Sequence, residues 1–153
     1  MQNAQPPKPL LAVVPDINVL VSSLINRHGP PGRIRAAWRR RKLVFIVSQI
    51  MIDKADEVLH RPHVFNAFLS PARAERRIQG LLRTLRQRTR LAPHALNLQV
   101  IKDDPEDNAI LIAAVEGKAD CIISGDRHLK ALKTYEGIPI LSPAEFVAQY
   151  NTP

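Results

Sequence analysis

The sequence DDPEDN at residues 103–108, followed by the apolar run AILIAAV at residues 109–115, organises the rest of the chain. Four carboxylates occupy five consecutive positions here, although the chain carries a net charge of +8. Crowded carboxylates repel one another and raise each other's pKa, so this cluster either faces water or holds a cation. Asp104 is a good N-cap and Pro105 suits the first helical turn, which predicts that a helix begins here. Because the residues after Asn108 are almost all apolar, that helix is expected to be buried on most sides.

The length and composition predict a globular protein with one domain. The chain has 153 residues, of which 45% are apolar, enough to form a sizeable core. Its single cysteine, Cys121, lies in an apolar run and is interpreted as a small buried hydrophobe, so nothing requires an oxidising compartment. No apolar run approaches the length of a membrane span, and we expect a cytoplasmic protein. Residues 1–10 are interpreted as a flexible N-terminal lead-in, and residues 11–150 as the single domain.

The charge is spread unevenly along the chain. Between Arg27 and Arg90 there are 16 lysines and arginines against 4 acidic residues, whereas from Ile101 to Pro153 there are 5 against 9. A basic surface beside an acidic pocket would suit a polyanion such as RNA held next to metal ions. Ordinary surface charge is the alternative, and the arginines between Arg73 and Arg90 are interpreted either as RNA contacts or as the solvated face of an amphipathic helix.

Apolar β-type runs alternate with helical patterns along the whole chain. Strands are expected at residues 11–14, 43–47, 98–101, 120–124 and 138–141, and helices at residues 17–25, 33–42, 49–59, 70–90, 105–116, 127–134 and 143–150. Continuous apolar strands separated by helices are typical of a parallel sheet that is covered on both faces. The predicted fold class is therefore α/β, a three-layer αβα arrangement with a parallel sheet of four or five strands. Trp38 is assigned to the core.

Acidic residues follow three of the expected strands. Asp16 follows the first, Asp104 and Asp107 follow the third, and Asp126 follows the fourth. Ligands of open parallel sheets bind outside the carboxyl ends of the strands, where these carboxylates would meet. Hard divalent cations such as Mg²⁺ prefer oxygen ligands, and two such ions can activate water and stabilise a leaving oxygen in phosphodiester hydrolysis.

Three stretches resemble the motifs of PIN-domain nucleases. The sequence VPDINVLVSSL at residues 14–24 is similar to their opening motif, usually an Asp-Thr-Asn after the first strand. The sequence DPEDN at residues 104–108 resembles their third acidic motif, and ADCIISGDRHL at residues 119–129 resembles their fourth. The likeness extends from Leu11 to Phe146 and is closest to the branch of PIN-family toxin components of toxin–antitoxin modules.

The resemblance implies a PIN-like, Rossmann-like fold and an endoribonuclease that depends on Mg²⁺ or Mn²⁺. It implies products with a 5′-phosphate and a 3′-hydroxyl, a protein antitoxin as partner, and a homodimer. It places the metal-binding carboxylates on Asp16, Asp107 and Asp126. Supporting residues implied by the same motifs are Asn18, Asp104 and Ser124, the last to orient the Asp126 carboxylate or a bound water.

The second motif departs from the family pattern. The family has a glutamate six positions after the serine that follows the second strand, and counting from Ser48 that position holds Lys54. Glu57 lies one helical turn further on, on roughly the same face, and could act as the second catalytic acid. Alternatively the site is impaired, and the protein is a PIN-fold module that binds RNA or protein without cutting. Ile17 in place of the usual threonine is a milder departure, because it removes a hydroxyl near the metals.

Overall fold

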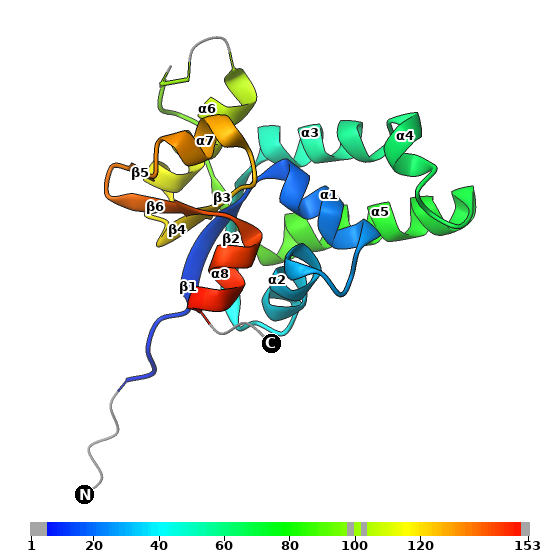
Figure 1. The fold of residues 1–153 in the computed structure, drawn as a ribbon, viewed down its shortest axis with the longest axis horizontal. Helices are drawn as coiled ribbons and strands as arrows, with labels where there is room; N and C mark the ends of the chain where they lie inside the picture. The colour runs from blue at the N-terminus through cyan, green and yellow to red at the C-terminus, as the bar shows by residue number, and fades with distance from the viewer. Residues whose placement is uncertain (1–5, 98–99, 102–103, 151–153) are drawn as a thin grey trace, which may run out of the picture.

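The computed structural model describes residues 6–97, 100–101 and 104–150. Six strands form one sheet in the order β3-β2-β1-β4-β6-β5 (Figure 1). All neighbouring pairs are parallel except β5 and β6, which are antiparallel. The strands are β1 (Leu11–Pro15), β2 (Leu43–Ser48), β3 (Arg90–Ala92), β4 (Cys121–Ile123), β5 (Thr134–Tyr135) and β6 (Ile138–Leu141).

Most helices begin at residues that the sequence marks as caps. Side chains of Ser48, Ser70, Asp104 and Ser142 accept hydrogen bonds from the first helical turn, and proline follows three of these four caps. The helices are α1 (Ile17–Ile25), α2 (Pro30–Arg39), α3 (Gln49–Leu59), α4 (Pro62–Phe65), α5 (Pro71–Arg88), α6 (Pro105–Glu116), α7 (Arg127–Ala131) and α8 (Pro143–Gln149). No helix of the described ranges is long and apolar enough to cross a membrane.

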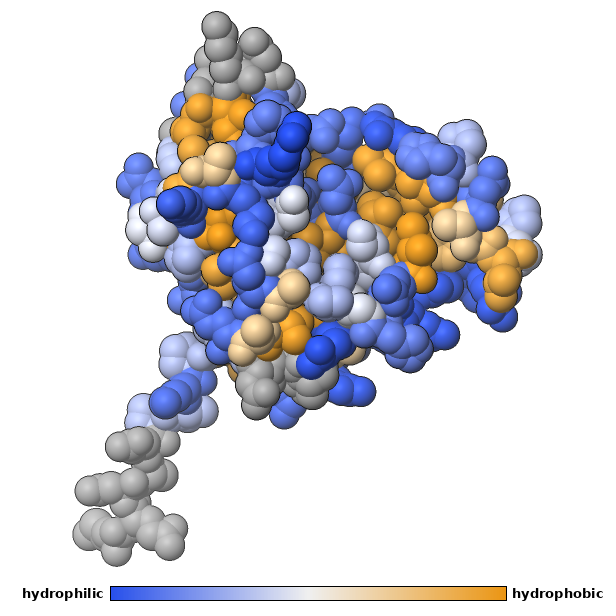
Figure 2. All heavy atoms as spheres, in the orientation of Figure 1, coloured by the Kyte–Doolittle hydropathy of each residue, from blue (hydrophilic) through white to orange (hydrophobic). Residues whose placement is uncertain are grey.

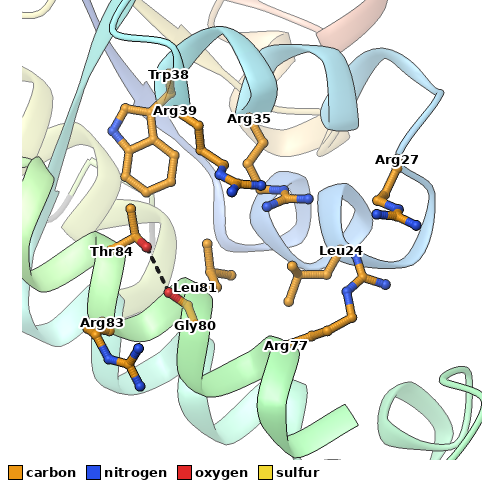
Figure 3. A pocket seen from close by; sticks show the side chains of 10 residues that line it. All are labelled: Leu24, Arg27, Arg35, Trp38, Arg39, Arg77, Gly80, Leu81, Arg83 and Thr84. Atoms are coloured by element: carbon orange, nitrogen blue, oxygen red, sulfur yellow. Dashed lines mark hydrogen bonds between the residues drawn. The ribbon is translucent and has the colours of Figure 1, made fainter. Parts of the chain in front are cut away.

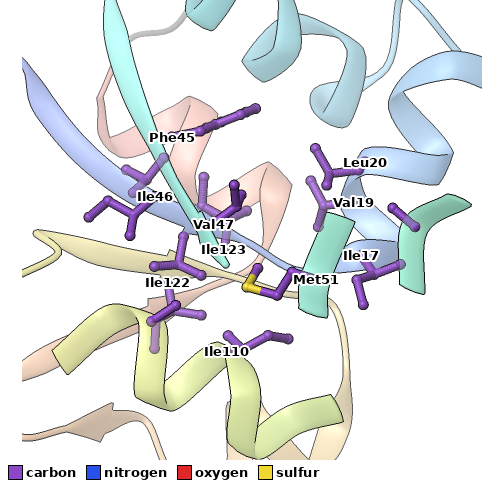
Figure 4. Packing of buried hydrophobic residues seen from close by; sticks show 14 of the residues in the cluster. Ile17, Val19, Leu20, Phe45, Ile46, Val47, Met51, Ile110, Ile122 and Ile123 are labelled. Atoms are coloured by element: carbon purple, nitrogen blue, oxygen red, sulfur yellow. The ribbon is translucent and has the colours of Figure 1, made fainter. Parts of the chain in front are cut away.

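The helices cover both faces of the sheet. Helix α6 contacts β1, β2 and β4 on one face, while α2 and α8 contact each other and cover the other face (Figures 1 and 4). Successive side chains of β2 point to opposite faces of the sheet and pack against different helix layers. Phe45 stacks on Trp38 of α2 with ring centroids 4.6 Å apart, whereas Ile46 lies so close to Gly117, at the end of α6, that a Cβ there would meet it at 2.6 Å. Trp38 is 3% exposed, which confirms its assignment to the core.

The sheet has six strands, so the predicted four or five was too few. Strand β3 forms at Arg90–Ala92, beside β2, where the sequence predicted the end of a helix. Its sequence, RLA, is too short to show an apolar run, and only Ala92 is buried. The strand expected at residues 98–101 does not appear at Val100 or Ile101, and Leu98 and Gln99 lie outside the described residues.

Strand β5 is a second departure from the predicted parallel sheet. A helix was expected to reach Thr134, but α7 ends at Ala131 and the chain then turns at Lys133, which has a φ of 59°. Glu136 and Gly137, with φ values of 51° and 75°, form a tight hairpin into β6. The hairpin adds an antiparallel edge strand, β5. This strand has only two residues, which is too short for a recognisable strand pattern in the sequence.

Candidate active site

The register of β1 and β4 brings Asp16 and Ser124 together. Pro15 pairs with Ile123, so the next residue of each segment lies at the carboxyl edge of the sheet. The N–H of Asp16 donates to the carbonyl of Ile123 at 2.9 Å, and the Ser124 hydroxyl donates to Oδ2 of Asp16 at 2.7 Å. Both side chains are buried. Asn18 contributes its backbone N–H, which donates to the other oxygen of Asp16 at 3.3 Å.

Asp126 is held beside this pair by the same serine. Its N–H donates to Oγ of Ser124 at 3.0 Å. Its carboxylate caps α7 by accepting from the N–H groups of His128 and Leu129 at 2.8 and 3.3 Å. Ser124 therefore orients the carboxylate of Asp16 and the backbone of Asp126, whereas the sequence predicted that it orients the Asp126 carboxylate or a bound water.

Helix α6 supplies the remaining carboxylates. Asp104 caps the helix and accepts from the N–H of Asp107 at 3.1 Å. Asn108 fixes the chain before the helix, because its side-chain amide exchanges two hydrogen bonds of 2.9 and 2.8 Å with the backbone of Ile101. The start of α6 is thus tied down, and Asp107 is 8% exposed.

The carboxylates from three segments of the chain interact electrostatically. Burial raises the pKa of Asp107 from 3.8 to about 7, and the negative charge of Asp104 adds to this effect. The charges of Asp126 and Asp16 raise the pKa of Asp107 in the same direction. Burial also raises the pKa of Asp16, against the hydrogen bonds from Ser124 and Asn18, which lower it. The fold therefore concentrates negative charge at one point, where charge neutralisation would be favourable.

The chemistry of these residues fits a hard divalent cation. Oδ2 of Asp107 is buried and has no hydrogen-bond partner among the residues that the structure describes. A buried acceptor without a partner, among carboxylates that repel it, is stabilised by a cation with oxygen ligands. In the described part of the chain, however, no three His, Cys, Asp or Glu side chains are assembled closely enough to hold an ion. The carboxylate oxygens that could bind a cation are thus present at this edge of the sheet, but in this conformation they are not close enough together to form one set of metal ligands.

The wall formed by α3 carries a cation where the sequence pattern expects an acid. The Lys54 ammonium lies 2.8 Å from Oε1 of Glu106 and 3.2 Å from Oε1 of Glu57. Glu57 also pairs with Arg61 at 3.2 Å. These hydrogen bonds lower the pKa of Glu57, so it is ionised but already shared by two cations. No ion pair of the described residues joins Lys54 to Asp16, Asp107 or Asp126.

A cleft of about 370 Å³ separates α3 from the start of α6. Ile17, at the start of α1, lines it together with Ile50, Lys54, Glu57 and Glu106, so the isoleucine that replaces the family's threonine faces this cleft. The role of Glu106 was not predicted from the sequence. It belongs to the DPEDN motif, but its partner Lys54 is close only in the folded chain.

Comparison with known proteins agrees with this architecture. The family model of the PIN domain matches residues 12–128, which is most of the chain. The protein therefore belongs to the PIN domain family. Members of this family are generally nucleases and typically use divalent metals. The chain is also 27% identical over 149 residues to an uncharacterized protein, MJ1680, of Methanocaldococcus jannaschii, and the match covers 92% of each protein.

Proposed function

We propose that this protein is an endoribonuclease that hydrolyses RNA phosphodiester bonds with the help of Mg²⁺ or Mn²⁺. The observation that supports the proposal is the electrostatic interaction of Asp107 with Asp16 and Asp126, together with Oδ2 of Asp107, which is buried without a hydrogen-bond partner among the described residues. Asp16 and Asp126 also cap α1 and α7, a structural role that satisfies only part of their hydrogen-bonding capacity. The three carboxylates have no cationic partner among the described ion pairs, so they are available to an external cation.

Each residue of the site has a defined task in this proposal. Asp16, Asp107 and Asp126 would hold the metal, and Ser124 keeps Asp16 and the backbone of Asp126 in place. Asp104 fixes the first turn of α6, which carries Asp107. A divalent ion bound there would supply positive charge to the scissile phosphate and lower the pKa of an attacking water. Glu57 is proposed as an assisting acid, acting from the other side of the cleft.

The decisive experiment is digestion of RNA with Mn²⁺ by the wild type and by Asp16→Asn. The wild type is expected to cut, leaving a 5′-phosphate and a 3′-hydroxyl, and Asp16→Asn to lose the activity. Glu136→Gln is the matched control, because it removes one negative charge at an exposed hairpin turn. Equal cleavage by wild type and Asp16→Asn would sink the assignment.

We further propose that the nuclease is the toxin of a toxin–antitoxin module in the cytoplasm, that it is bound by a protein antitoxin and that it forms a homodimer. Apolar side chains gather over α3, α4 and α5 on the face seen in Figure 2, which supports a protein partner. Leu69, between α4 and α5, is 85% exposed, and Ile25, at the end of α1, is 45% exposed. Expression of the wild type should arrest growth, whereas Asp16→Asn should not, and light scattering would measure the mass in solution.

A second candidate function follows from Lys54. Its ion pairs with Glu57 and Glu106 occupy the wall where the family pattern has an acid, which favours a PIN-fold module that binds RNA or protein without cutting. The two candidates differ in one measurement. Under this alternative the wild type binds RNA but does not cut it at any Mn²⁺ concentration.

A further inference from the structure

A second pocket, of about 280 Å³, lies between α2 and α5 (Figure 3). It reaches α1 at Leu24, near the end of the helix that Asp16 caps at its start. Its aliphatic and aromatic lining includes Leu24 and Trp38. We call it the arginine pocket, because half of its lining residues are arginines: Arg27, Arg35, Arg39, Arg77 and Arg83. Figure 3 shows Arg35 and Arg39 extending from α2 toward α5, and Arg77 extending from α5 toward Arg27.

No acidic side chain of the described residues neutralises the positive charge of the arginine pocket. None of its five arginines takes part in an ion pair within the described residues. The acids of this basic region are engaged elsewhere. Asp56 and Glu75 pair with His60, Glu57 pairs with Lys54 and Arg61, and Asp53 accepts from Gln49.

Arg35 experiences this uncompensated charge most strongly. Burial lowers the pKa of Arg35 to about 10, and the charges of Arg39, Arg77 and Arg27 act in the same direction. Its Nε is buried, and no described residue supplies it with a hydrogen-bond acceptor. An unpartnered buried donor and a set of repelling cations are both unfavourable in the free protein. One ligand with negative charge and several acceptor oxygens would relieve both.

Gly80 lies at an open part of the arginine pocket. It lies inside α5 and lines the pocket, yet a Cβ added there would meet no atom within 4 Å. Glycine in a helix interior costs about 1 kcal/mol relative to alanine, so packing alone does not account for it. The helices around the gap are joined, because the indole N–H of Trp38 donates to the carbonyl of Arg88 at 3.2 Å.

We propose that the arginine pocket is a phosphate-binding site and that its ligand is a backbone phosphate of the RNA strand that the acidic site cleaves. The identity of the strand rests on the proposed nuclease function, whereas the phosphate chemistry rests on the pocket alone. Planar guanidinium groups bind phosphate oxygens through paired N–H donors, and Arg is favoured over Lys where this geometry is required. The volume accommodates a phosphate group with a few waters, at about 30 Å³ per water.

The position of the arginine pocket relative to the acidic site fits one strand of RNA. Asp16 caps the start of α1, and Leu24 lines the pocket near the end of the same helix. At 1.5 Å per residue, the two positions are roughly 12 Å apart along the helix. A stacked strand rises about 3.4 Å per nucleotide along its axis, so about four nucleotides or fewer would span the distance.

The test replaces the gap at Gly80 with a carboxylate. Gly80→Glu would supply an internal anion to the arginines, and Gly80→Gln is the matched control, with the same shape and no charge. Binding of a short fluorescein-labelled RNA is measured by anisotropy in EDTA, where no cleavage occurs. Gly80→Glu is expected to weaken binding by about tenfold or more and to reduce the slope of log affinity against log salt by about 0.7 for each phosphate that the protein no longer binds. Gly80→Gln should bind like the wild type, and neither variant should lower the melting temperature.

Inorganic pyrophosphate provides the second arm. It should raise the melting temperature of the wild type and of Gly80→Gln, but not of Gly80→Glu. Equal RNA affinity of Gly80→Glu and Gly80→Gln would overturn the assignment to the RNA backbone, even if pyrophosphate protects. Stronger protection by a polyglutamate peptide than by pyrophosphate would show that the pocket takes an acidic protein segment instead. Failure of the wild type to cleave RNA with Mn²⁺ would contradict the proposed nuclease function but not the phosphate site, because RNA binding in EDTA is measured without cleavage.

Discussion

Lys54 of α3 and Glu106 of α6 form an ion pair of 2.8 Å across the cleft beside the acidic site. The pair ties together two helices that carry different sequence motifs, and Lys54 also contacts Glu57 at 3.2 Å. The hydrogen bonds to Glu106 and Glu57 raise the pKa of Lys54, so it stays charged at neutral pH. The Lys54 ammonium thus neutralises Glu57 and Glu106, two carboxylates of the cleft that could otherwise attract a metal ion.

Lys54→Glu is expected to increase Mn²⁺-dependent cleavage by about tenfold or more, because it removes the competing cation and adds an oxygen ligand near the site. The same change places a third carboxylate beside Glu57 and Glu106. The melting temperature of the variant should therefore fall in EDTA and rise again when Mn²⁺ is added. Cleavage rates and melting curves are measured across a Mn²⁺ titration. Lys54→Met is the control that removes the cation without adding an acid. Unchanged cleavage in Lys54→Glu would mean that position 54 does not limit the reaction.

Ser124→Ala is expected to reduce cleavage by about 10- to 100-fold, as is typical when a partner of a metal ligand is removed. Without the hydroxyl, Oδ2 of Asp16 loses a buried donor and the N–H of Asp126 loses its acceptor. The free energy of unfolding should also fall, by roughly 1–3 kcal/mol. Denaturant unfolding and the Mn²⁺ concentration at half-maximal rate report the two effects.

Ser124→Thr separates orientation from folding, because it keeps the hydroxyl and changes only the volume. Its half-maximal Mn²⁺ concentration should return toward that of the wild type, even if stability does not. If Ser124→Ala keeps the wild-type Mn²⁺ dependence, the hydrogen bond to Asp16 does not position a metal ligand.

Asp107→Asn should make the metal-free protein more stable, and the gain should depend on pH. The pKa of Asp107 is raised from 3.8 to about 7 in the folded protein. Between these values the folded protein keeps a proton that the unfolded chain releases, so wild-type stability falls as pH rises through this window. The advantage of Asp107→Asn should be near zero below pH ~4 and reach roughly 1–2 kcal/mol above pH ~7.

Urea unfolding in chelator at several pH values measures this difference. Added Mn²⁺ should reverse the order of stability at neutral pH, because only the wild type gains the ion. A difference in stability that stays constant between acidic and neutral pH would contradict the raised pKa of Asp107.

Glu116→Gln should destabilise the segment that follows β3. The carboxylate of Glu116 accepts from three consecutive backbone N–H groups, those of His94, Ala95 and Leu96, at 2.7, 2.7 and 3.2 Å. An amide supplies one oxygen in place of two, so at least one of these donors loses its acceptor. The expected cost is about 1–3 kcal/mol, with faster hydrogen exchange at these three amides. Glu136→Gln, at the exposed β5–β6 turn, should change neither quantity.

The sequence predicted the elements whose signals are local. Side-chain caps at Ser48, Ser70 and Asp104 were recognised and are confirmed, because a cap depends only on the next three residues. Strands with continuous apolar runs were also recognised. β3 and β5 were missed, since an edge strand is held by its neighbour and need not be apolar.

The candidate site could be predicted only in outline. The positions after β1 and β4 were recognised as an edge where acids would gather, but the contact between Ser124 and Asp16 depends on the register of two strands. The ion pair of Lys54 with Glu106 depends on how α3 approaches α6. The arginine pocket combines α2 and α5, and neither helix shows by itself which arginines face the other.

The pairing of Pro15 with Ile123 has a consequence for how the protein loses activity. Asp16 and Ser124 follow directly on the two central strands, and the amide of Asp16 is bonded to the carbonyl of Ile123. This amide can exchange with solvent only when the strands separate, which is an opening of the whole core. Heat inactivation and global unfolding should therefore follow a single curve, and a partly unfolded form that keeps these two strands paired should also keep the contact between Asp16 and Ser124.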